Sequence, residues 1–275
     1  MLLAQIFNTD ILSCDARQFY REIRIGTSAP KDQMLDDIIH HFIGNLTIWN
    51  FYSAGDYQKD ALKKLNELFT RLPIVLMVGG SGLYGRVITN GIDYLPFITK
   101  EISKDLFIKN KVQKELKKKN VDLNNFHRFL RSLVVLKYSN RSLFSYHRKT
   151  AISYNFHIMK IGLTLSRGIL YKRLEKRIVT MMKIGLLEEA QECYYFRYLN
   201  ALHAIAYSDI FNYFDGTISF EKTIEEIKKN TKRYAKRQLT WYKKEKKMQW
   251  FFSFKENEII ENVKKKLASI KNKMS

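Results

Sequence analysis

The sequence has little proline, glycine or cysteine, and each shortage excludes a class of protein. Three prolines and twelve glycines in 275 residues leave little material for long flexible linkers, so any second domain must be an insertion. Cys14 and Cys193 are too few and too far apart for a disulfide framework or a metal-binding knuckle. A chain of this kind suits a reducing cytoplasm.

Long apolar runs are missing as well. No uninterrupted apolar segment approaches the ~18 residues that a membrane helix needs, and the N-terminus has no charged region followed by an apolar one. We therefore expect a cytoplasmic protein that makes no use of a membrane. We also expect a monomer. The hydrophobic content of 45% still allows a substantial core, enough for one large domain or two smaller ones.

Acidic residues are strongly outnumbered by basic ones. The chain has 48 Lys and Arg against 27 Asp and Glu, which gives a formal charge of +21. This excess is larger than solubility requires, and its sign suits a polyanionic partner. Nucleic acid is the first candidate partner, although a genome biased toward lysine is an alternative source of part of the excess.

Short apolar runs alternate with helical patterns, which is typical of a parallel α/β sheet. The expected strands are residues 10–14, 41–48, 74–79 and 158–165. The expected helices are residues 57–70, a helix that begins after Ser166, residues 186–196 and residues 221–247.

The pattern changes between residues 100 and 149, which are strongly basic, helical in period and without strand signals. We expect a small helical insertion there. The predicted organisation is a core of residues 1–99 and 150–250, an insertion at 100–149 and a C-terminal tail at 251–275.

Polar groups follow two of the expected strands. In open α/β sheets, ligands bind beyond the carboxyl ends of the strands. Asp15 and Gln18 follow the first strand, and a glycine-rich turn at 78–85 that contains Ser81 follows the third. The glycines let the backbone approach a ligand closely, and Ser81 offers a hydroxyl. Taken singly, a helix cap explains the aspartate and a tight turn explains the glycines equally well.

Four longer stretches, taken together, resemble the tRNA dimethylallyltransferase family in order and spacing. They are ILSCDARQFYREIRIGTSAP, HHFIGNLTIWNFYSAGDYQKDA, PIVLMVGGSGLYGRVITNGID and NTKRYAKRQLTWYKK, with shorter matches at HRFLR, RLEKR and GLLEEA. The resemblance covers nearly the whole chain and implies a P-loop NTPase-like parallel sheet flanked by helices. Members of that family transfer a prenyl group from dimethylallyl diphosphate to the exocyclic amine of the adenosine 3′ of the anticodon.

The resemblance also implies roles for individual residues. The family's Asp-Ser-Arg-Gln corresponds to Asp15, Ala16, Arg17 and Gln18, which are expected to contact the tRNA. Asp15 would be the general base for the amine of a flipped-out adenosine, and Gln18 would hydrogen-bond the same base. Ser81 matches a Thr or Ser near the tRNA substrate and is expected to serve catalysis beside Asp15.

Two basic sets complete the site that the resemblance implies. They are His127, Arg128 and Arg131 for the anticodon stem-loop of tRNA, and Lys232, Arg233 and Arg237 for diphosphate. Lys232 stands where the family commonly has Arg. The positive charge is kept, but a lysine cannot bind phosphate oxygens through two parallel hydrogen bonds as an arginine can. A solvated basic face is the alternative for the first set. A transferase or kinase that acts on free nucleotides is an alternative function, because it would have the same kind of sheet. The basic insertion argues against it, since a mononucleotide needs no such extended positive surface.

The family's N-terminal strand and phosphate loop, of the form GPTxxGKT, have no counterpart here. The sequence begins MLLAQIFNTDILSCDARQ and contains no GxxxxGK[ST] motif. That strand normally lies in mid-sheet, so its loss would leave two edges unpaired. Either the true start lies upstream of Met1, or the chain is a catalytically inactive tRNA-binding remnant, and the codons before Met1 decide between the two. Mg²⁺ bound with the diphosphate is the expected cofactor.

Overall fold

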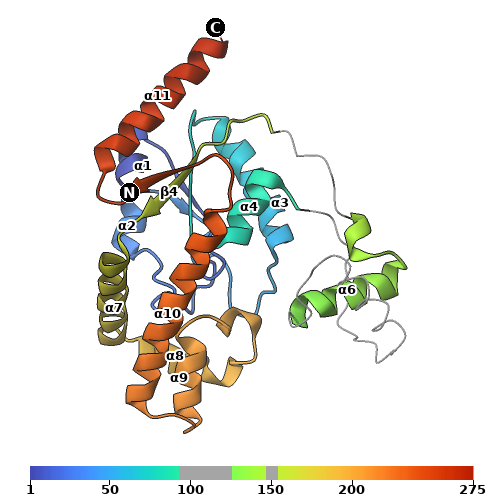
Figure 1. Cartoon of the computed structure of the whole chain (residues 1–275), viewed down its shortest axis with the longest axis vertical. Helices are drawn as coiled ribbons and strands as arrows, with labels where there is room; N and C mark the ends of the chain where they lie inside the picture. The colour runs from blue at the N-terminus through green and yellow to red at the C-terminus, as the bar shows by residue number, and fades with distance from the viewer. Residues whose placement is uncertain (93–125, 147–153, 275) are drawn as a thin grey trace. The chain divides into compact units, whose positions relative to one another are not determined.

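The fold comes from a computed structural model that describes residues 1–92, 126–146 and 154–274 (Figure 1). The chain divides into two compact units, one made of Met1–Thr89 with Phe156–Ser275 and the other of Asn90–Asn155. The insertion expected at 100–149 falls within the second unit, and its residues 100–125 and 147–149 lie outside the described part. The described part of that unit contains α6 (Phe126–Ser139) and a 3₁₀ turn η1 (Leu143–Tyr146).

Parallel strands organise the first unit, as the sequence predicts. The strands among the described residues are β1 (Ile11–Ser13), β2 (His40–His41), β3 (Leu76–Val78), β4 (Lys160–Thr164) and β5 (Met248–Phe252). They form two parallel sheets, one with the order β2-β1-β3 and one in which β4 pairs with β5. Because Ser13 lies opposite Val78, the carboxyl ends of β1 and β3 meet at one edge.

The strand expected at 41–48 is wrong in extent, because β2 ends at His41. Phe42 and Gly44 have φ values of 64° and 58°, which belong to the left-handed region and end the extended conformation. The apolar run that suggested a strand instead passes through a turn. A single bridge between Tyr20 and Leu46 is its remaining strand-like pairing in the described chain.

Helices surround these strands and match most of the expected positions. They are α1 (Leu2–Phe7), α2 (Asp32–Asp37), α3 (Ala54–Phe69), α4 (Gly82–Asn90), α7 (Arg167–Lys183), α8 (Leu186–Cys193), α9 (Tyr207–Phe214), α10 (Phe220–Tyr242) and α11 (Glu256–Met274), with 3₁₀ turns η2 (Tyr194–Phe196) and η3 (Asn200–Leu202). The helix expected at 221–247 ends at Tyr242, and Lys247 adopts a φ of 64° directly before β5. The expected C-terminal tail contains the end of β5 and the helix α11.

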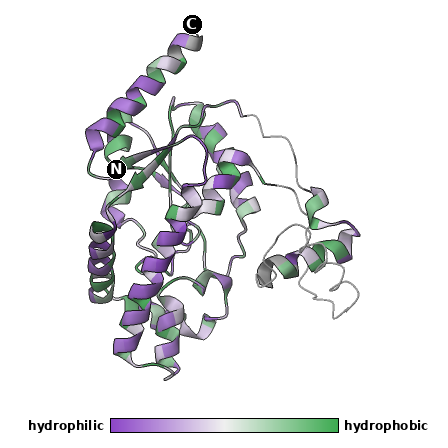
Figure 2. Cartoon of the chain, in the orientation of Figure 1, coloured by the Kyte–Doolittle hydropathy of each residue, from purple (hydrophilic) through white to green (hydrophobic). Residues whose placement is uncertain are grey.

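α10 has one packed side and one exposed side. It packs against α7 and α9 and buries Ile227, Thr231 and Ala235. Figure 2 draws it mostly in hydrophilic colours, in keeping with the Lys and Arg residues on its other side. No helix of the described residues has the length and apolar character needed to cross a bilayer.

An aromatic cluster supports the end of β1. Its rings belong to Phe19, Phe42, Tyr52, Tyr57 and Tyr84, with centroids 5.3–6.4 Å apart. Phe19 and Tyr57 are fully buried, and the Tyr57 hydroxyl donates to the carbonyl of Ser13 at 2.9 Å. Burial raises the pKa of Tyr57, so this hydroxyl stays protonated and keeps its bond to the strand.

Candidate active site

Asp15 lies half-buried in the polar loop that follows β1, and the loop holds one of its two carboxylate oxygens. The backbone N–H of Arg17 donates to Asp15 Oδ1 at 3.0 Å, and the N–H of Asp15 donates to the Ser13 hydroxyl at 3.3 Å. Oδ2 faces the glycine-rich turn, since a Cβ built on Gly80 would lie 3.6 Å from it. The loop therefore orients the carboxylate and presents Oδ2 toward the turn after β3.

The glycines of that turn are needed because other parts of the protein approach them closely. The groups that an added Cβ would meet within 3 Å are Cys14 and Asp15 for Gly79, Gln238 for Gly80 and Trp241 for Gly82. The sequence suggests close approach of a ligand, whereas the structure shows close approach of β1 and α10. Absence of a Cβ thus lets three elements converge on Asp15.

Ser81 links the loop after β1 to α10. Its hydroxyl accepts the backbone N–H of Ala16 at 2.9 Å, and the Gln238 amide donates to the carbonyl of Gly80 at 3.0 Å. Burial raises the pKa of Tyr234, which lies one turn before Gln238 on α10, and Asp15 raises it further, whereas Ser81 and Gln238 lower it. The structure thus brings Ser81 next to Asp15, as the resemblance implies, and adds two residues of α10 that the sequence analysis did not place in the site.

Arg17 and Gln18 use their side-chain donors inside the protein. The Arg17 guanidinium donates to the carbonyls of Asn200 at 2.6 Å, Ala201 at 3.2 Å and His203 at 3.3 Å. The Gln18 amide donates to the carbonyls of Thr27 at 3.2 Å and Ser28 at 3.1 Å. Both residues, expected to contact tRNA, therefore also fix the shape of the loop that carries Asp15.

Glu189 of α8 clamps the continuation of this loop. Its carboxylate accepts the backbone N–H groups of Ile25 at 2.8 Å and Gly26 at 2.9 Å, and the Tyr207 hydroxyl at 2.5 Å. Burial, reinforced by Glu189, raises the pKa of Tyr207 and keeps that donor protonated. The sequence offered GLLEEA as part of the resemblance but gave no reason to join Glu189 to residues 25 and 26.

The expected diphosphate ligands differ in their availability. Lys232 Nζ forms an ion pair with Glu175 at 2.5 Å and lies 5.3 Å from the ring centroid of Tyr171. Arg233 is exposed, and the guanidinium of Arg237 lies 5.8 Å from the ring centroid of Tyr234. Lys232 is thus engaged with a carboxylate, whereas the two arginines are open to an anion.

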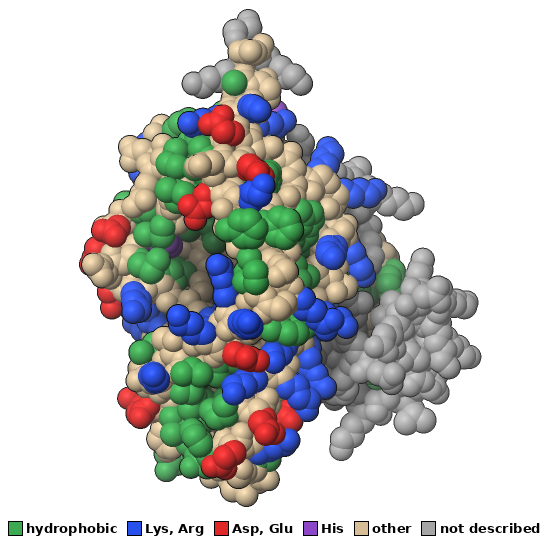
Figure 3. Space-filling view, turned by 60° about the vertical axis from the view of Figure 1, so that its left-hand side comes forward, with side chains coloured by type: hydrophobic (Ala, Val, Ile, Leu, Met, Phe, Trp, Pro, Cys, Tyr) green, Lys and Arg blue, Asp and Glu red, His purple; other side chains and the backbone are tan. Residues whose placement is uncertain are grey.

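Arg177 of α7 is a further cation of the site that the sequence analysis quoted but did not assign. It reaches solvent, yet enough protein surrounds it that desolvation lowers the pKa of its guanidinium, while nearby Asp15 raises it. Within the described part of the chain, Arg177 forms no ion pair. Figure 3 shows Lys and Arg side chains gathered around a hollow on one face of the first unit.

The expected tRNA contacts on α6 belong to the second unit. Arg131 is exposed on this helix. His127 and Arg128 fall within the bounds of α6, but their side chains lie outside the described part.

Neither cysteine has the properties of a nucleophile. Cys14 and Cys193 are free and buried. Burial raises the pKa of the Cys14 thiol to about 12 and that of Cys193 to about 11. Both thiols therefore stay protonated at neutral pH.

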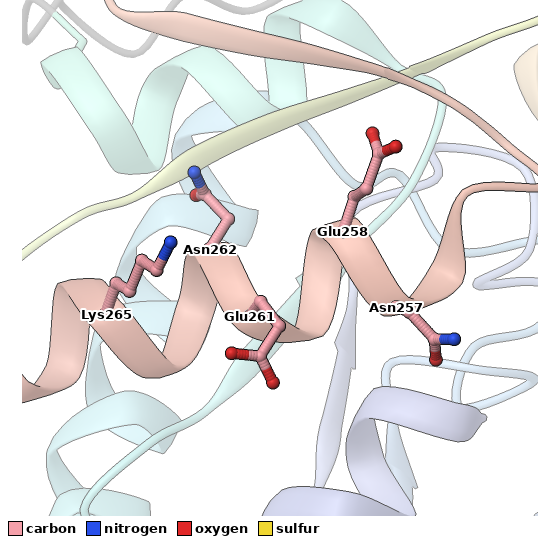
Figure 4. Close-up of a pocket in the computed structure, with 5 residues that line it drawn as sticks. All are labelled: Asn257, Glu258, Glu261, Asn262 and Lys265. Atoms are coloured by element: carbon pink, nitrogen blue, oxygen red, sulfur yellow. The ribbon is translucent and has the colours of Figure 1, made fainter.

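A pocket elsewhere on the first unit is separate from these residues. It is lined by Asn257, Glu258, Glu261, Asn262 and Lys265, all on α11 (Figure 4). No side chain of this pocket contributes to the meeting point of β1, β3 and α10. In the described ranges, no three His, Cys, Asp or Glu side chains come together as a metal-binding group.

Comparisons with known proteins bear on the family to which the chain belongs. Residues 18–245 match the family model described as IPP transferase. The chain is 40% identical over 267 residues to the tRNA dimethylallyltransferase of Christiangramia forsetii, covering 93% of this chain and 88% of the relative. It is 38% identical to that of Flavobacterium psychrophilum, covering 96% and 92%. The full-length tRNA isopentenylpyrophosphate transferase of Bacillus halodurans superposes with a TM-score of 0.71 at 26% identity, over 99% of this chain and 92% of the other.

Proposed function

The chain belongs to the IPP transferase family, and from this premise we propose that it transfers a dimethylallyl group from dimethylallyl diphosphate to the exocyclic amine of an adenosine in tRNA. It is a tRNA-modifying prenyltransferase with a P-loop NTPase-like fold of parallel sheets flanked by helices. One structural observation supports the proposal most strongly. Asp15 keeps one carboxylate oxygen, Oδ2, directed at the turn where β1, β3 and α10 converge.

The chemistry follows from what that oxygen can accept. The adenosine amine attacks the allylic carbon, a C–N bond forms, the C–O bond breaks, and diphosphate leaves with the bonding electrons. The amine is a poor nucleophile, so a carboxylate that takes its proton as the bond forms lowers the barrier, typically by about 10²–10⁴-fold. Asp15 would take that proton on Oδ2 while Oδ1 stays bonded to Arg17 N–H.

Basic side chains around the site suit the leaving diphosphate. Arg177 and Arg233 form no ion pair with a carboxylate in the described residues, and Arg237 is likewise open. A planar guanidinium can bind phosphate oxygens with two parallel hydrogen bonds. We therefore rank these three arginines ahead of Lys232, whose charge is partly neutralised by Glu175.

Mg²⁺ is part of the proposal only as a companion of the substrate. Asp15 supplies one carboxylate, and no three potential ligands gather in the described part of the chain. These residues do not form a dedicated metal site, although Mg²⁺ commonly binds one or two carboxylates together with substrate phosphates.

The tRNA would bind through charge, with the target base flipped out toward Asp15. Stacking in the anticodon loop hinders the target amine, so we expect the base to be extruded into a pocket, as in other base-modifying enzymes. The net charge of +21, the exposed arginines of α10 and Arg131 of α6 suit the phosphate backbone of the anticodon stem-loop. We expect the enzyme to act as a monomer in the cytoplasm.

The direct test is a prenylation assay. The purified chain is incubated with dimethylallyl diphosphate, MgCl₂ and either unmodified tRNA or AMP, and products are analysed by nucleoside mass spectrometry. We expect one dimethylallyl group on an adenosine of the tRNA and none on AMP. Binding of tRNA without any transfer would instead support the non-catalytic alternative, and transfer to AMP would support an enzyme of free nucleotides.

A further inference from the structure

Exposed aromatic side chains are concentrated on two short segments of the first unit. In the described part of the chain, the aromatic residues that are more than half exposed are Trp49, Phe51, Tyr195, Tyr198 and Phe254. All but Phe254 belong to residues 49–51, which precede α3, or to residues 195–198, which follow α8. Large rings are mostly buried in folded proteins, so this distribution calls for a functional reason.

Trp49 and Phe196 bring the two segments together. Their ring centroids lie 4.5 Å apart with the ring planes at 67°, an edge-to-face contact that holds the indole in place. Trp49 still remains 55% exposed, and Phe196 can cover only one of the two faces of the indole. We call residues 49–51 and 195–198, joined by this contact, the aromatic surface. Its indole offers a flat and already ordered face to a partner.

Both segments are anchored to the loop that carries Asp15. The Arg17 guanidinium donates to the carbonyl of Asn200 at 2.6 Å, just after the second segment. The backbone N–H of Ile48, just before the first segment, donates to Glu22 Oε2 at 3.0 Å. Since Arg17 and Glu22 follow Asp15 closely in the sequence, the aromatic surface borders the loop of the candidate active site.

The charge of the aromatic surface suits a polyanion. Its two segments contain no acidic residue and one arginine, Arg197. Two carboxylates at its border, those of Glu22 and Asp215, already accept protein donors. Rings next to an arginine, on a chain with a net charge of +21, suit single-stranded nucleic acid. The bases of such a strand stack on the rings while its phosphates face the cations.

Flipping of the target nucleotide gives a base a reason to stack here. When an adenosine leaves the loop, each neighbouring base loses a stacking partner. An aromatic side chain can replace that partner, because every base has a face to stack on. Resting on the proposed function, we propose that Trp49 stacks on the base of a nucleotide adjacent to the flipped adenosine. The aromatic surface then holds the anticodon loop open during transfer.

The test pairs Trp49→Ala with the removal of single bases from the RNA. An unmodified anticodon stem-loop is prepared intact, or with an abasic nucleotide on the 5′ or the 3′ side of the target adenosine, and its Kd is measured for both proteins. The wild type should bind the intact stem-loop about 5- to 100-fold more tightly than the variant, the value of one base–aromatic stack. With one of the two abasic stem-loops this ratio should fall to about 1, because the stack is absent from both complexes. Ratios that are equal for all three RNAs would overturn the proposal.

Phe254→Ala is the matched control. Phe254 is 61% exposed, and its ring stacks on Phe252 at a centroid distance of 5.4 Å, away from the two segments. Its removal should leave the Kd of every stem-loop within a few fold of the wild-type value. Thermal unfolding of Trp49→Ala reports whether that variant is folded.

A second readout keeps the proposal testable if Trp49→Ala does not fold. Trp49→Phe keeps a ring that can pack on Phe196 and stack on a base, so it should bind the stem-loop within a few fold of the wild type. The emission of Trp49, taken as the difference between the wild type and Trp49→Phe, should be quenched by the stem-loop, because a stacked base quenches an indole. Emission that does not change on binding would contradict the stack.

Self-association is the competing use of an exposed aromatic surface. Sedimentation velocity should show the same monomer for the wild type and Trp49→Ala. A wild-type dimer that Trp49→Ala converts to a monomer would overturn the stacking role.

Failure of the proposed function is distinguishable from failure of this inference, because each Kd is measured without dimethylallyl diphosphate. If the wild type binds the stem-loop but transfers no prenyl group, the proposed function is lost, and the comparison of abasic stem-loops still decides whether Trp49 stacks. If the wild type does not bind the intact stem-loop, the proposal itself is overturned.

Discussion

Replacing Gly79 by alanine should disturb the catalytic aspartate without touching it directly. The new Cβ would lie 2.6 Å from Cys14 Sγ, 2.7 Å from the Cys14 carbonyl carbon and 2.9 Å from the N–H nitrogen of Asp15. Comfortable carbon contacts need about 3.5–4.0 Å, so β1 and β3 must separate by roughly 1 Å at this point. The hydrogen bond from Cys14 N–H to the Val78 carbonyl, 2.8 Å long, opposes that separation.

Two effects of different size follow from that displacement. Overpacking of this kind costs about 1–3 kcal/mol of unfolding free energy. A displacement of about 1 Å in a catalytic group lowers the rate by about 10²-fold. We therefore expect a folded Gly79→Ala variant with modest destabilisation in urea and a single-turnover prenylation rate about 100-fold below that of the wild type.

Gly168→Ala in α7 is the matched control, since nothing lies within 4 Å of its added Cβ. Alanine should stabilise this helix by up to about 1 kcal/mol and leave the rate unchanged. A Gly79→Ala variant that keeps the wild-type rate would refute the reasoning, because the turn would then tolerate the group that the geometry excludes.

Two further predictions concern the groups that hold the site and the sheet. Glu189→Gln weakens the charged acceptor of Ile25, Gly26 and Tyr207, so it should lower the unfolding free energy by about 1–3 kcal/mol, whereas exposed Glu188→Gln should not. Faster hydrogen exchange at amides 25 and 26 in Glu189→Gln would confirm the cause, and unchanged exchange would contradict it. The buried carboxylate of Asp10 is hydrogen-bonded to His41 at 2.9 Å and to Arg71 at 2.7 Å. Burial raises the pKa of Asp10, but these two partners lower it more, so the pKa lies below its ordinary value of 3.8. The ionised Asp10 therefore contributes to the free energy of unfolding above its unfolded-state pKa, and this contribution is lost as the pH falls through the lowered folded-state pKa. The wild type should be more stable than Asp10→Asn by roughly 2 kcal/mol at pH 7, and this difference should disappear in acid. A gap that stays constant down to acid unfolding would rule this out.

Local chemistry was enough to predict much of the fold and the position of Asp15. The strands near residues 10–14, 74–79 and 158–165 are present, because short apolar runs between polar turns have few other structures available. β5 was missed because the helical period of α10 continues through a run of lysines, and only pairing with β4 makes Met248–Phe252 extended. The strand end at His41 depends on the left-handed conformations of Phe42 and Gly44, which spacing does not reveal.

Contacts between distant segments account for the parts of the site that the sequence could not give. Arg17 is bonded to carbonyls more than 180 residues away in the sequence, which no local pattern records. Gln238 lies on the same helix as core residues, and only the fold shows that its amide donates to the carbonyl of Gly80. The glycines at 79, 80 and 82 signal close approach, but sequence alone does not show whether a ligand or the protein approaches.

The central claim is that Asp15 takes the proton of the adenosine amine, and Asp15→Asn tests it most directly. Asparagine keeps the size of the side chain, and its carbonyl oxygen can still accept the N–H of Arg17. With tRNA and dimethylallyl diphosphate both saturating, the single-turnover rate should fall by about 10²–10⁴-fold, while tRNA affinity changes by only a few fold. A rate equal to that of the wild type would contradict the account.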